Sequence, residues 1–412
     1  SNDNYLKIHN LDLTSPLISS PDVLTSQLVV DKVIDDKTKL NSSFKMYEDL
    51  SKAENDRYQY IFPDFLFTKK IDIDESYNGN FLFTSSGFQK NYDTNIHEAL
   101  LNNDFLFESN DIFSNIGLVH DYDFLVKNYN TYSKNSTTYE EKNDHEVYST
   151  VLFNTSYPLK KSLENSTNLL KPIISARYSP NNTRNISDKS LRLSYNNAFA
   201  FNRIGTTDMV EGGKSLSLGF EFEKLNSDQT NIFNFNLANV FRDKKNLNLP
   251  KKSTLGQTRS DIVGYLAYTP NDVWKIDYDF SYDRDLDHSN FDSISSTLNV
   301  NNFVTTFAYL TENHEGGNSE TLSNETSYNI NDENKLTFVT TKDLINDFTE
   351  YYNLVYSYET DCLFASFEYN KKFYRDGSLL PTQSLSFFIR YIPFTEIRGT
   401  ADTLVNRKKS KN

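Results

Sequence analysis

The stretch VWKIDYDFSYD, residues 273–283, decides the fold of this chain. From Trp274 to Tyr282 every second residue is a large apolar or aromatic one, and charged or small polar residues stand between them. Successive side chains of a β-strand point to opposite faces, so the pattern predicts a strand with one apolar and one polar face. The same alternation recurs at Phe81 and Phe83, at Leu191, Leu193 and Tyr195, at Phe233, Phe235 and Leu237, and at Leu385, Phe387, Ile389 and Tyr391.

The composition extends this prediction to the whole chain. Aromatic residues make up 14% of the 412 residues, with 27 Tyr and 31 Phe, yet the mean hydropathy is −0.61. Large apolar side chains diluted among polar ones suit strands that have one apolar and one wet face. Turn-rich pieces divide the chain into roughly 20 strands of about 10 residues, the length that crosses a bilayer at a tilt. No convincing helical period is found, and an almost all-β protein is expected.

Strand length separates two kinds of β-protein. Strands of soluble sandwiches are usually about five or six residues long and present their polar face outwards. Longer strands with aromatic ends favour a large antiparallel transmembrane β-barrel, in which the apolar face meets lipid and the polar face lines a lumen. Closing the sheet would also remove the unpaired edges of so many strands. A porin-like passive solute channel shares this pattern and remains an alternative, as does a soluble or surface-exposed β-protein.

The sequence suggests three parts of unequal size. Residues 1–22, with two prolines, are expected to be an irregular lead-in or an edge strand. Residues 23–397 are expected to form the barrel, and residues 398–412 a basic tail in solvent. The formal net charge of −14 argues against a nucleic-acid partner, which would require a basic surface.

The tetrapeptide Gly-Gly-Lys-Ser at 212–215 has the ending of a phosphate-binding loop. The first glycine of that motif is replaced by Asp208, whose carboxylate would repel a phosphate. A period of two begins at Leu216 and runs to Phe222, where the motif requires a helix. A loop that leads into a strand is therefore predicted in place of a nucleotide site.

Acidic residues near 283–288 suggest chemistry but fail its requirements. Asp283, Asp285 and Asp287 have the opening spacing of a calcium loop, but its glycine position is His288 and its closing glutamate is Ile294. The pair Asp287-His288 could activate a water, but no second catalytic pair accompanies it. A solvated turn is the simpler prediction. The six histidines are scattered without metal-ligand spacing, so no catalytic, metal or cofactor site is predicted.

Four segments carry a further signal when they are read in order. They are RYQYIFPDFLF (57–67), LKPIISARYSP (170–180), FNRIGTTDMVEGGKSLSLGFEFE (201–223) and CLFASFEYNKKFYRDGSLLPTQSLSFFIRYIPF (362–394). Together they resemble the C-terminal domain of the LptD family of lipopolysaccharide-assembly proteins, particularly its α-proteobacterial members. Residues 260–302 fit the same order, so the resemblance spans most of the chain.

The resemblance implies a non-enzymatic transport function in the Gram-negative outer membrane. Members of this family form a very large barrel that holds an LptE-like lipoprotein plug in its lumen. They receive lipopolysaccharide from a periplasmic Lpt bridge through an N-terminal domain, which this sequence lacks, and release it sideways into the outer leaflet. No cofactor is implied.

The resemblance also implies where release occurs, namely at a weak seam between the first and last strands. The last strand would be residues 383–391, beginning at Gln383. Phe388 would face the lumen, and Pro393 would remove one N–H donor near the strand's end. The lipid face would consist of Leu385, Phe387, Ile389 and Tyr391.

The lone cysteine, Cys362, matches one member of an adjacent cysteine pair in the family. The resemblance therefore implies a disulfide to the missing N-terminal region, which an exported protein permits, and a small buried hydrophobe is the alternative. The chain departs from the family at Asp208-Met209, where an Asp-Arg pair is expected, so a role for that arginine does not carry over.

Overall fold

The computed structural model describes residues 23–189, 191–206, 209–313, 318–373, 382–391 and 395–404. In these ranges 22 strands form one sheet, and every pairing between neighbours is antiparallel. The strands of the first half are β1 (Val23–Val33), β2 (Thr38–Asp49), β3 (Tyr58–Ile71), β4 (Gly79–Tyr92), β5 (Ile96–Ser109), β6 (Ile112–Phe113), β7 (Val119–Lys134), β8 (Asn143–Ser156), β9 (Leu159–Ser162), β10 (Ser166–Ser179) and β11 (Gly213–Asn226).

The second half continues in the same way with shorter strands. They are β12 (Asn231–Arg242), β13 (Ile262–Asn271), β14 (Trp274–Tyr282), β15 (Ser289–Val300), β16 (Phe303–Glu312), β17 (Ser319–Asn329), β18 (Asn334–Asp343), β19 (Phe348–Glu359), β20 (Leu363–Lys372), β21 (Thr382–Tyr391) and β22 (Thr395–Leu404). Helical structure in the described residues is limited to α3 (Tyr195–Ala198) and the single turns η1 (Glu54–Asp56), η2 (Glu75–Tyr77) and η3 (Lys252–Thr254). None of these helices is long and apolar enough to cross a membrane.

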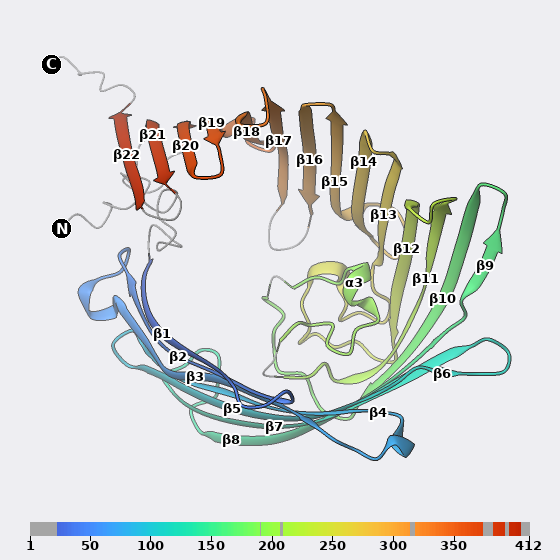
Figure 1. Cartoon of the computed structure of the whole chain (residues 1–412). Helices are drawn as coiled ribbons and strands as arrows, with labels where there is room; N and C mark the ends of the chain where they lie inside the picture. The colour runs from blue at the N-terminus through green and yellow to red at the C-terminus, as the bar shows by residue number, and fades with distance from the viewer. Residues whose placement is uncertain are drawn as a thin grey trace.

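The strand order is a simple meander. Each long strand pairs with the next long strand in the chain, while the short β6 and β9 run beside β7 and β10. The sheet curls around a central space, which brings β1 and β22 to the same side of the molecule (Figure 1). No pairing joins β1 to β22 within the described ranges, so the two ends of the sheet are not closed by a ladder there.

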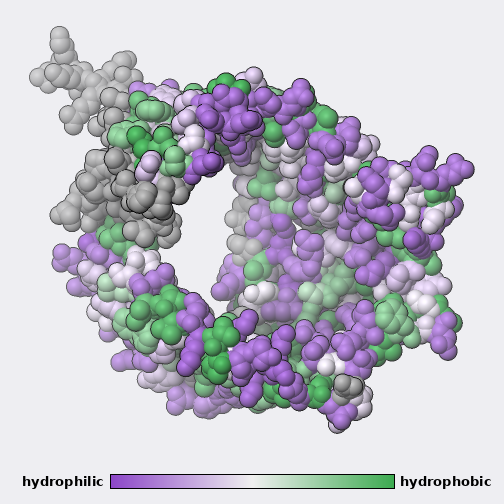
Figure 2. Space-filling model, viewed as in Figure 1, coloured by the Kyte–Doolittle hydropathy of each residue, from purple (hydrophilic) through white to green (hydrophobic). Residues whose placement is uncertain are grey.

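The two faces of the sheet differ as the alternation predicts. On β14 the outward side carries Trp274, which is 42% exposed, and the inward side carries Ser281, which is 1% exposed. Cross-strand partners share a face, so Tyr278 and Ile294 stand side by side on the outer surface. Apolar residues appear beside polar ones across the surface in view, and the interior is open (Figure 2). The prediction of an all-β barrel wall with alternating faces is confirmed.

One predicted strand is wrong. The alternation of Leu191, Leu193 and Tyr195 does not form a strand, because residues 191–194 are irregular and α3 begins at Tyr195. Leu193 and Tyr195 are instead buried inside the curve of the sheet, at 1% and 8% exposure. The alternation of apolar residues at 191–195 therefore comes from the burial of an irregular segment and not from a β-strand.

The C-terminal end also differs from the prediction. The strand at 383–391, now β21, is not the last one, because β22 pairs with it from Tyr391↔Thr395 to Thr382↔Leu404. The predicted boundary at residue 398 consequently falls within β22. Residues 1–22 and Pro393 lie outside the described residues, as does the end of the basic tail from residue 405.

Candidate functional site

The interior of the sheet holds an inward segment, residues 180–212, that connects β10 to β11 (Figure 1). Its buried side chains, Leu193 and Ile204 among them, pack against Val240 and Val263 on the inner faces of β12 and β13. The connection 243–261 adds Leu249 and Leu255 to the same cluster. The inner face of the sheet is expected to be polar, yet it carries Val240 and Val263. The inward segment covers these two side chains and so explains why they are apolar.

Local sequence fixes the turn of helix at the centre of this segment. Ser194 caps α3, and Asn197 accepts a hydrogen bond from the Ser194 backbone N–H through its side-chain oxygen at 2.9 Å. On the wall opposite, Gly219 of β11 leaves room for Phe199, because a Cβ at Gly219 would lie 2.7 Å from that ring. The same Cβ would lie 2.1 Å from the carbonyl oxygen of Leu237, so glycine permits a close approach there.

A second set of contacts joins the inward segment to strands β5, β7 and β8 of the wall. Val210 lies in a cluster with Leu125, Tyr129 and Tyr148 on β7 and β8. Phe201 packs against the same cluster. The segment therefore spans the interior between the β5–β8 region and the β12–β13 region, and it narrows the space that the sheet encloses.

Four buried charged residues fasten the inward segment, and we call them the arginine clasp: Arg177, Arg203, Glu211 and Arg242. Arg203 donates to both carboxylate oxygens of Glu211, from Nη2 at 2.6 Å and from Nε at 3.0 Å. Arg242 of β12 donates to the same carboxylate and to the carbonyl of Gly212, and Arg177 of β10 donates to the backbone carbonyl of Glu211. The side chains of Arg203, Glu211 and Arg242 are 1–2% exposed.

The charge state of the clasp follows from its surroundings. Burial alone would raise the pKa of Glu211, but the positive charges of Arg203, Arg177 and Arg242 outweigh burial and hold that pKa at about 2. Glu211 is therefore ionised throughout the neutral range. Two guanidinium groups share the Glu211 carboxylate, and that of Arg177 binds the backbone carbonyl of the same residue. Removing the carboxylate would leave buried positive charges uncompensated, so its loss should loosen the segment from the wall.

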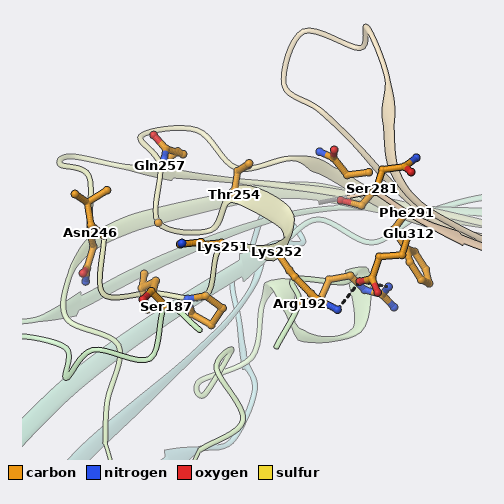
Figure 3. A pocket seen from close by; sticks show the side chains of 16 residues that line it. Ser187, Arg192, Asn246, Lys251, Lys252, Thr254, Gln257, Ser281, Phe291 and Glu312 are labelled. Atoms are coloured by element: carbon orange, nitrogen blue, oxygen red, sulfur yellow. Dashed lines mark ion pairs between the residues drawn. The ribbon is translucent and has the colours of Figure 1, made fainter. Parts of the chain in front are cut away.

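A cavity of about 520 Å³ opens between the inward segment, the connection 243–261 and the inner faces of β14–β16. We call it the luminal cavity (Figure 3). At one side of the cavity Glu312 forms an ion pair with Lys252, whose Nζ lies 2.8 Å from Oε1. A longer ion pair joins the same oxygen to Nη1 of Arg192 at 3.9 Å. The Arg192 guanidinium stacks on Phe291, 3.1 Å from the ring centroid. Burial lowers the pKa of Arg192, and the charges of Glu312 and Asp279 oppose that shift.

The predicted seam residues from Gln383 to Tyr391 share one strand, β21, and divide between its two faces. Leu385, Phe387, Ile389 and Tyr391 are 39–52% exposed, whereas Ser384 and Ser386, which alternate with the first of them, are 5% and 9% exposed. Phe388 is on the same face as those serines, opposite Ser366, and its ring lies 5.7 Å from that of Phe364. Gln383 is half-buried and accepts a hydrogen bond from Tyr369 at 3.1 Å. Whether this strand releases a lipid remains a prediction.

The other predicted features are separate from the luminal cavity. Cys362 is exposed in the turn between β19 and β20, so it is not a buried hydrophobe. Gly213 begins β11, as predicted for a loop that leads into a strand, while Asp208 lies outside the described residues. Asp283 accepts backbone N–H groups of its own turn, including that of Asp287 at 2.7 Å. No cluster of three or more metal-ligating side chains occurs in the described part of the chain.

Comparison of the sequence with known families gives a match over most of the chain. The sequence model of LptD, LPS transport system D, matches residues 25–354. The chain belongs to the LptD family. Membership supports lipopolysaccharide transport at the level of the family and points to a Gram-negative outer membrane. LptD is a family of transport proteins rather than of enzymes. No curated protein sequence matches the chain.

Solved structures of similar shape share little sequence with this chain. The siderophore receptor PirA from Acinetobacter baumannii has 8% identity and a TM-score of 0.44, covering 92% of this chain and 73% of its own. A mutant of the ferric enterobactin receptor PfeA from Pseudomonas aeruginosa has 8% identity and a TM-score of 0.43, covering 92% of this chain and 71% of its own. A mutant porin of Rh. blastica has 11% identity and a TM-score of 0.27, covering 72% of this chain and 90% of its own.

Sequence reasoning missed most of the luminal site of this LptD-family chain. The arginine clasp joins residues up to 65 positions apart, from Arg177 to Arg242, so no local motif contains it. A usable signal was nevertheless present: two connections of 33 and 19 residues, 180–212 and 243–261, are far longer than a hairpin needs. The apolar residues within them indicate packing against the barrel interior.

Proposed function

We propose that this chain is the barrel of an outer-membrane translocon that delivers lipopolysaccharide to the outer leaflet through a seam between β1 and the C-terminal strands β21 and β22. The observation that carries the proposal is the open sheet: within the described residues β1 pairs only with β2, and β22 only with β21. A seam without ladder hydrogen bonds opens at low free-energy cost. Lipid chains can then enter hydrocarbon while the sugars stay in a polar lumen.

The lengths of the connections support an orientation in the membrane. The connections 180–212 and 243–261 leave the same end of the sheet, and turns such as 227–230 and 272–273 lie at the other end. Outer-membrane barrels have short periplasmic turns and longer extracellular loops. The inward segment and the luminal cavity would accordingly lie toward the cell exterior, and Cys362, in the short turn 360–362, would face the periplasm.

This orientation supports the partners that the family implies. An LptE-like plug would occupy the remaining lumen, and the periplasmic Lpt bridge would reach the barrel through the N-terminal domain. A disulfide from Cys362 to that domain is sterically open, because the residue is exposed in the turn between β19 and β20. In the full-length protein we expect a maleimide reagent to label Cys362 only after reduction. Labelling without reduction would exclude the bridge.

Site-specific crosslinking in living cells tests the transport function. A photo-crosslinking amino acid is placed at Phe388, on the inner face of β21, and at Thr306, on the inner face of β16. We expect lipopolysaccharide adducts at Phe388 and far fewer at the matched control Thr306, because the seam lies beside β21. An outward control at Trp274 reports contact with membrane lipid alone. Correctly inserted protein without adducts at Phe388 would contradict seam release.

A porin-like passive solute channel is the second candidate, and the inward segment favours it. A polypeptide folded into the lumen is the feature by which such channels restrict solutes, and residues 180–212 occupy that place here. Conductance across a planar bilayer distinguishes the two functions. A steady open pore in the absence of crosslinks at Phe388 would favour the channel, whereas a closed barrel with crosslinks supports lipid transport.

A further inference from the structure

We propose that a groove on the outer, lipid-facing side of the wall binds a phosphorylated glycolipid that resides in the outer leaflet, with one acyl chain in the groove and a phosphate at its rim. We call this feature the outer groove. It lies across β8 and β10–β12, and its volume of about 640 Å³ falls within the range of small-molecule sites, roughly 300–1,000 Å³. Strands β10–β12 lie across the molecule from β1 and β22, so the groove is separate from the seam (Figure 1).

A small side chain between large ones makes the groove. Ala176 of β10 is exposed on the outer face, and its cross-strand partners are Phe153 of β8 and Leu216 of β11. Phe241 of β12 pairs with Leu216 and extends the same row. The three large side chains are 36–43% exposed. A methyl group between them leaves a depression that is open to the surroundings of the wall and suits an alkyl chain.

One end of the groove is polar. Tyr178, two residues beyond Ala176, pairs with Lys214, whose ammonium lies 5.7 Å from the centroid of the Tyr178 ring. Asp243 completes the lining at this end. All three stand where β10, β11 and β12 adjoin the connections 180–212 and 243–261, the end that the proposed orientation places at the cell exterior. The choice of leaflet therefore rests on the proposed function.

The charges at the rim match a lipid phosphate. Lys214 is exposed and forms no ion pair with any residue that the structure describes. Arg259 pairs with Phe241 on the outer face, 5.9 Å from its ring, and its Nε donates to a neutral amide, that of Asn239, at 3.2 Å. Two cations thus stand near the single lining carboxylate, that of Asp243. Basic residues at a membrane surface attract anionic lipids and bind their phosphate oxygens.

The arginine clasp fixes the wall behind the groove. Arg177 follows Ala176 in the chain but points inwards, where it donates to the backbone carbonyl of Glu211. Arg242 follows Phe241 and donates to the Glu211 carboxylate. Their charges are used on the inner face and add nothing to the rim. A groove on a fixed part of the wall has its shape before a ligand arrives, which lowers the cost of binding.

The rim also favours a glycolipid over a phospholipid. A carboxylate repels phosphate but accepts hydrogen bonds from hydroxyl groups, so Asp243 suits a sugar hydroxyl beside the phosphate that Lys214 holds. A phosphorylated sugar supplies both groups from one ring. Cardiolipin supplies two phosphates without a sugar, and it is therefore the anionic lipid against which the preference is measured.

Native mass spectrometry of the purified full chain, released from detergent, tests the outer groove with lipid A and cardiolipin as probes. We expect the wild type to retain lipid A in preference to cardiolipin. A176F fills the groove and should lose most of this lipid A, whereas A99F, the same change at an outward alanine of β5, should keep it. K214Q should weaken lipid A binding about fivefold, the effect of one basic residue near an anionic lipid, and K224Q at the other end of β11 should not. Equal retention within either pair of variants, or a preference for cardiolipin, would overturn the proposal.

Crosslinking in cells separates this resident lipid from the transported one. A photo-crosslinking amino acid at Phe153, in the groove, should form more adducts with lipopolysaccharide than one at Ile174, on the same outer face but outside the groove. A176F should abolish this excess and leave adducts at Phe388 unchanged. Equal adducts at Phe153 and Ile174, or loss of the Phe388 adducts in A176F, would overturn the proposal. An excess at Phe153 without any adducts at Phe388 would contradict seam release and support the outer groove.

Discussion

Arg203 and Glu211 form a bidentate ion pair with almost no solvent exposure, and Arg242 of β12 donates to the same carboxylate. Arg203 and Glu211 both belong to the inward segment, whereas Arg242 belongs to the barrel wall. The hydrogen bond from Arg242 to Glu211 therefore joins the segment to the wall. Ser215 and Ser217 of β11 accept further hydrogen bonds from Arg203, at 2.5 Å and 3.1 Å. The inward segment is thus part of the folded barrel rather than a loose loop.

The first prediction removes the carboxylate of the arginine clasp. We expect E211Q to lower stability by about 3–5 kcal/mol, because three buried guanidinium groups lose their shared counter-charge. The inward segment should detach first, since the wall keeps its own ladder hydrogen bonds. Trypsin should then cut at Arg184, Arg192 and Arg203 within the segment, as mass spectrometry of the digest can show.

An exposed ion pair provides the matched control for this change. Glu140 pairs with Lys142 at 2.5 Å, but both side chains are more than half exposed. Since exposed pairs contribute about 0–1 kcal/mol, E140Q should leave the digest and the melting temperature nearly unchanged. Equal protection of the inward segment in E211Q and wild type would show that packing alone holds it.

The second prediction concerns acid pH. The pKa of Glu211 is held at about 2 in the folded protein, below its ordinary value of 4.5. A carboxyl group whose pKa is lowered by folding stabilises the protein fully above the unfolded value, and that contribution disappears as the pH falls toward the folded value. The loss should therefore occur between about pH 4.5 and pH 2 and reach on the order of 3 kcal/mol.

Comparison with E211Q isolates this one group from the other carboxylates. The difference in melting temperature between the wild type and E211Q should be largest near pH 6. That difference should become smaller as the pH falls below 4.5. Circular dichroism in detergent measures both proteins under the same conditions. A margin that stays constant down to pH 2.5 would mean that Glu211 does not titrate in this range.

The third prediction tests the close approach between the inward segment and β11. In G219A the added Cβ would meet the backbone oxygen of Leu237 at 2.1 Å and the ring of Phe199 at 2.7 Å. Backbone cannot yield cheaply, so we expect a loss of about 1–3 kcal/mol and weaker protection of the segment. In G264A the nearest atoms belong to the movable ring of Phe280, at 2.3 Å, and the nearest backbone atom, the oxygen of Asn236, is at 2.8 Å rather than 2.1 Å, so that control should cost less.

How far the sequence predicts this fold depends on the kind of interaction. Strand β14 was predictable because the alternation from Trp274 to Tyr282 is a local signal that one strand satisfies by itself. On the outward side Trp274 is exposed, and on the inward side Ser281 is covered, in keeping with the period of two. The function was predictable from the resemblance to a family, because that resemblance depends on the order of segments along the chain and needs no contacts in space.

The luminal site was not predictable for the opposite reason. Leu193 and Tyr195 show the same period of two, yet their partners, such as Val240 and Val263, are distant in sequence and become neighbours only when the sheet curls. Lys252 and Glu312 likewise meet across 60 positions. The identity of the terminal strand was missed because β22 has weak apolar alternation, and its pairing with β21 appears only in the structure.

The fourth prediction uses the two faces of β16 to test that the wall sits in a bilayer. Phe307 faces outwards and is 53% exposed, while its neighbour Thr306 faces inwards and lies within hydrogen-bond distance of Thr297, at 2.9 Å. An arginine on the lipid face near mid-membrane costs about 2–4 kcal/mol, whereas an arginine in the lumen remains solvated. F307R should therefore fold less completely into lipid vesicles than T306R. The fraction folded is measured from the heat-dependent shift in mobility on a gel.

The two variants carry the same added charge one residue apart. A difference between them therefore depends only on which face of the sheet carries the arginine. Equal folding of the two would mean that the outer face of β16 is not in contact with lipid.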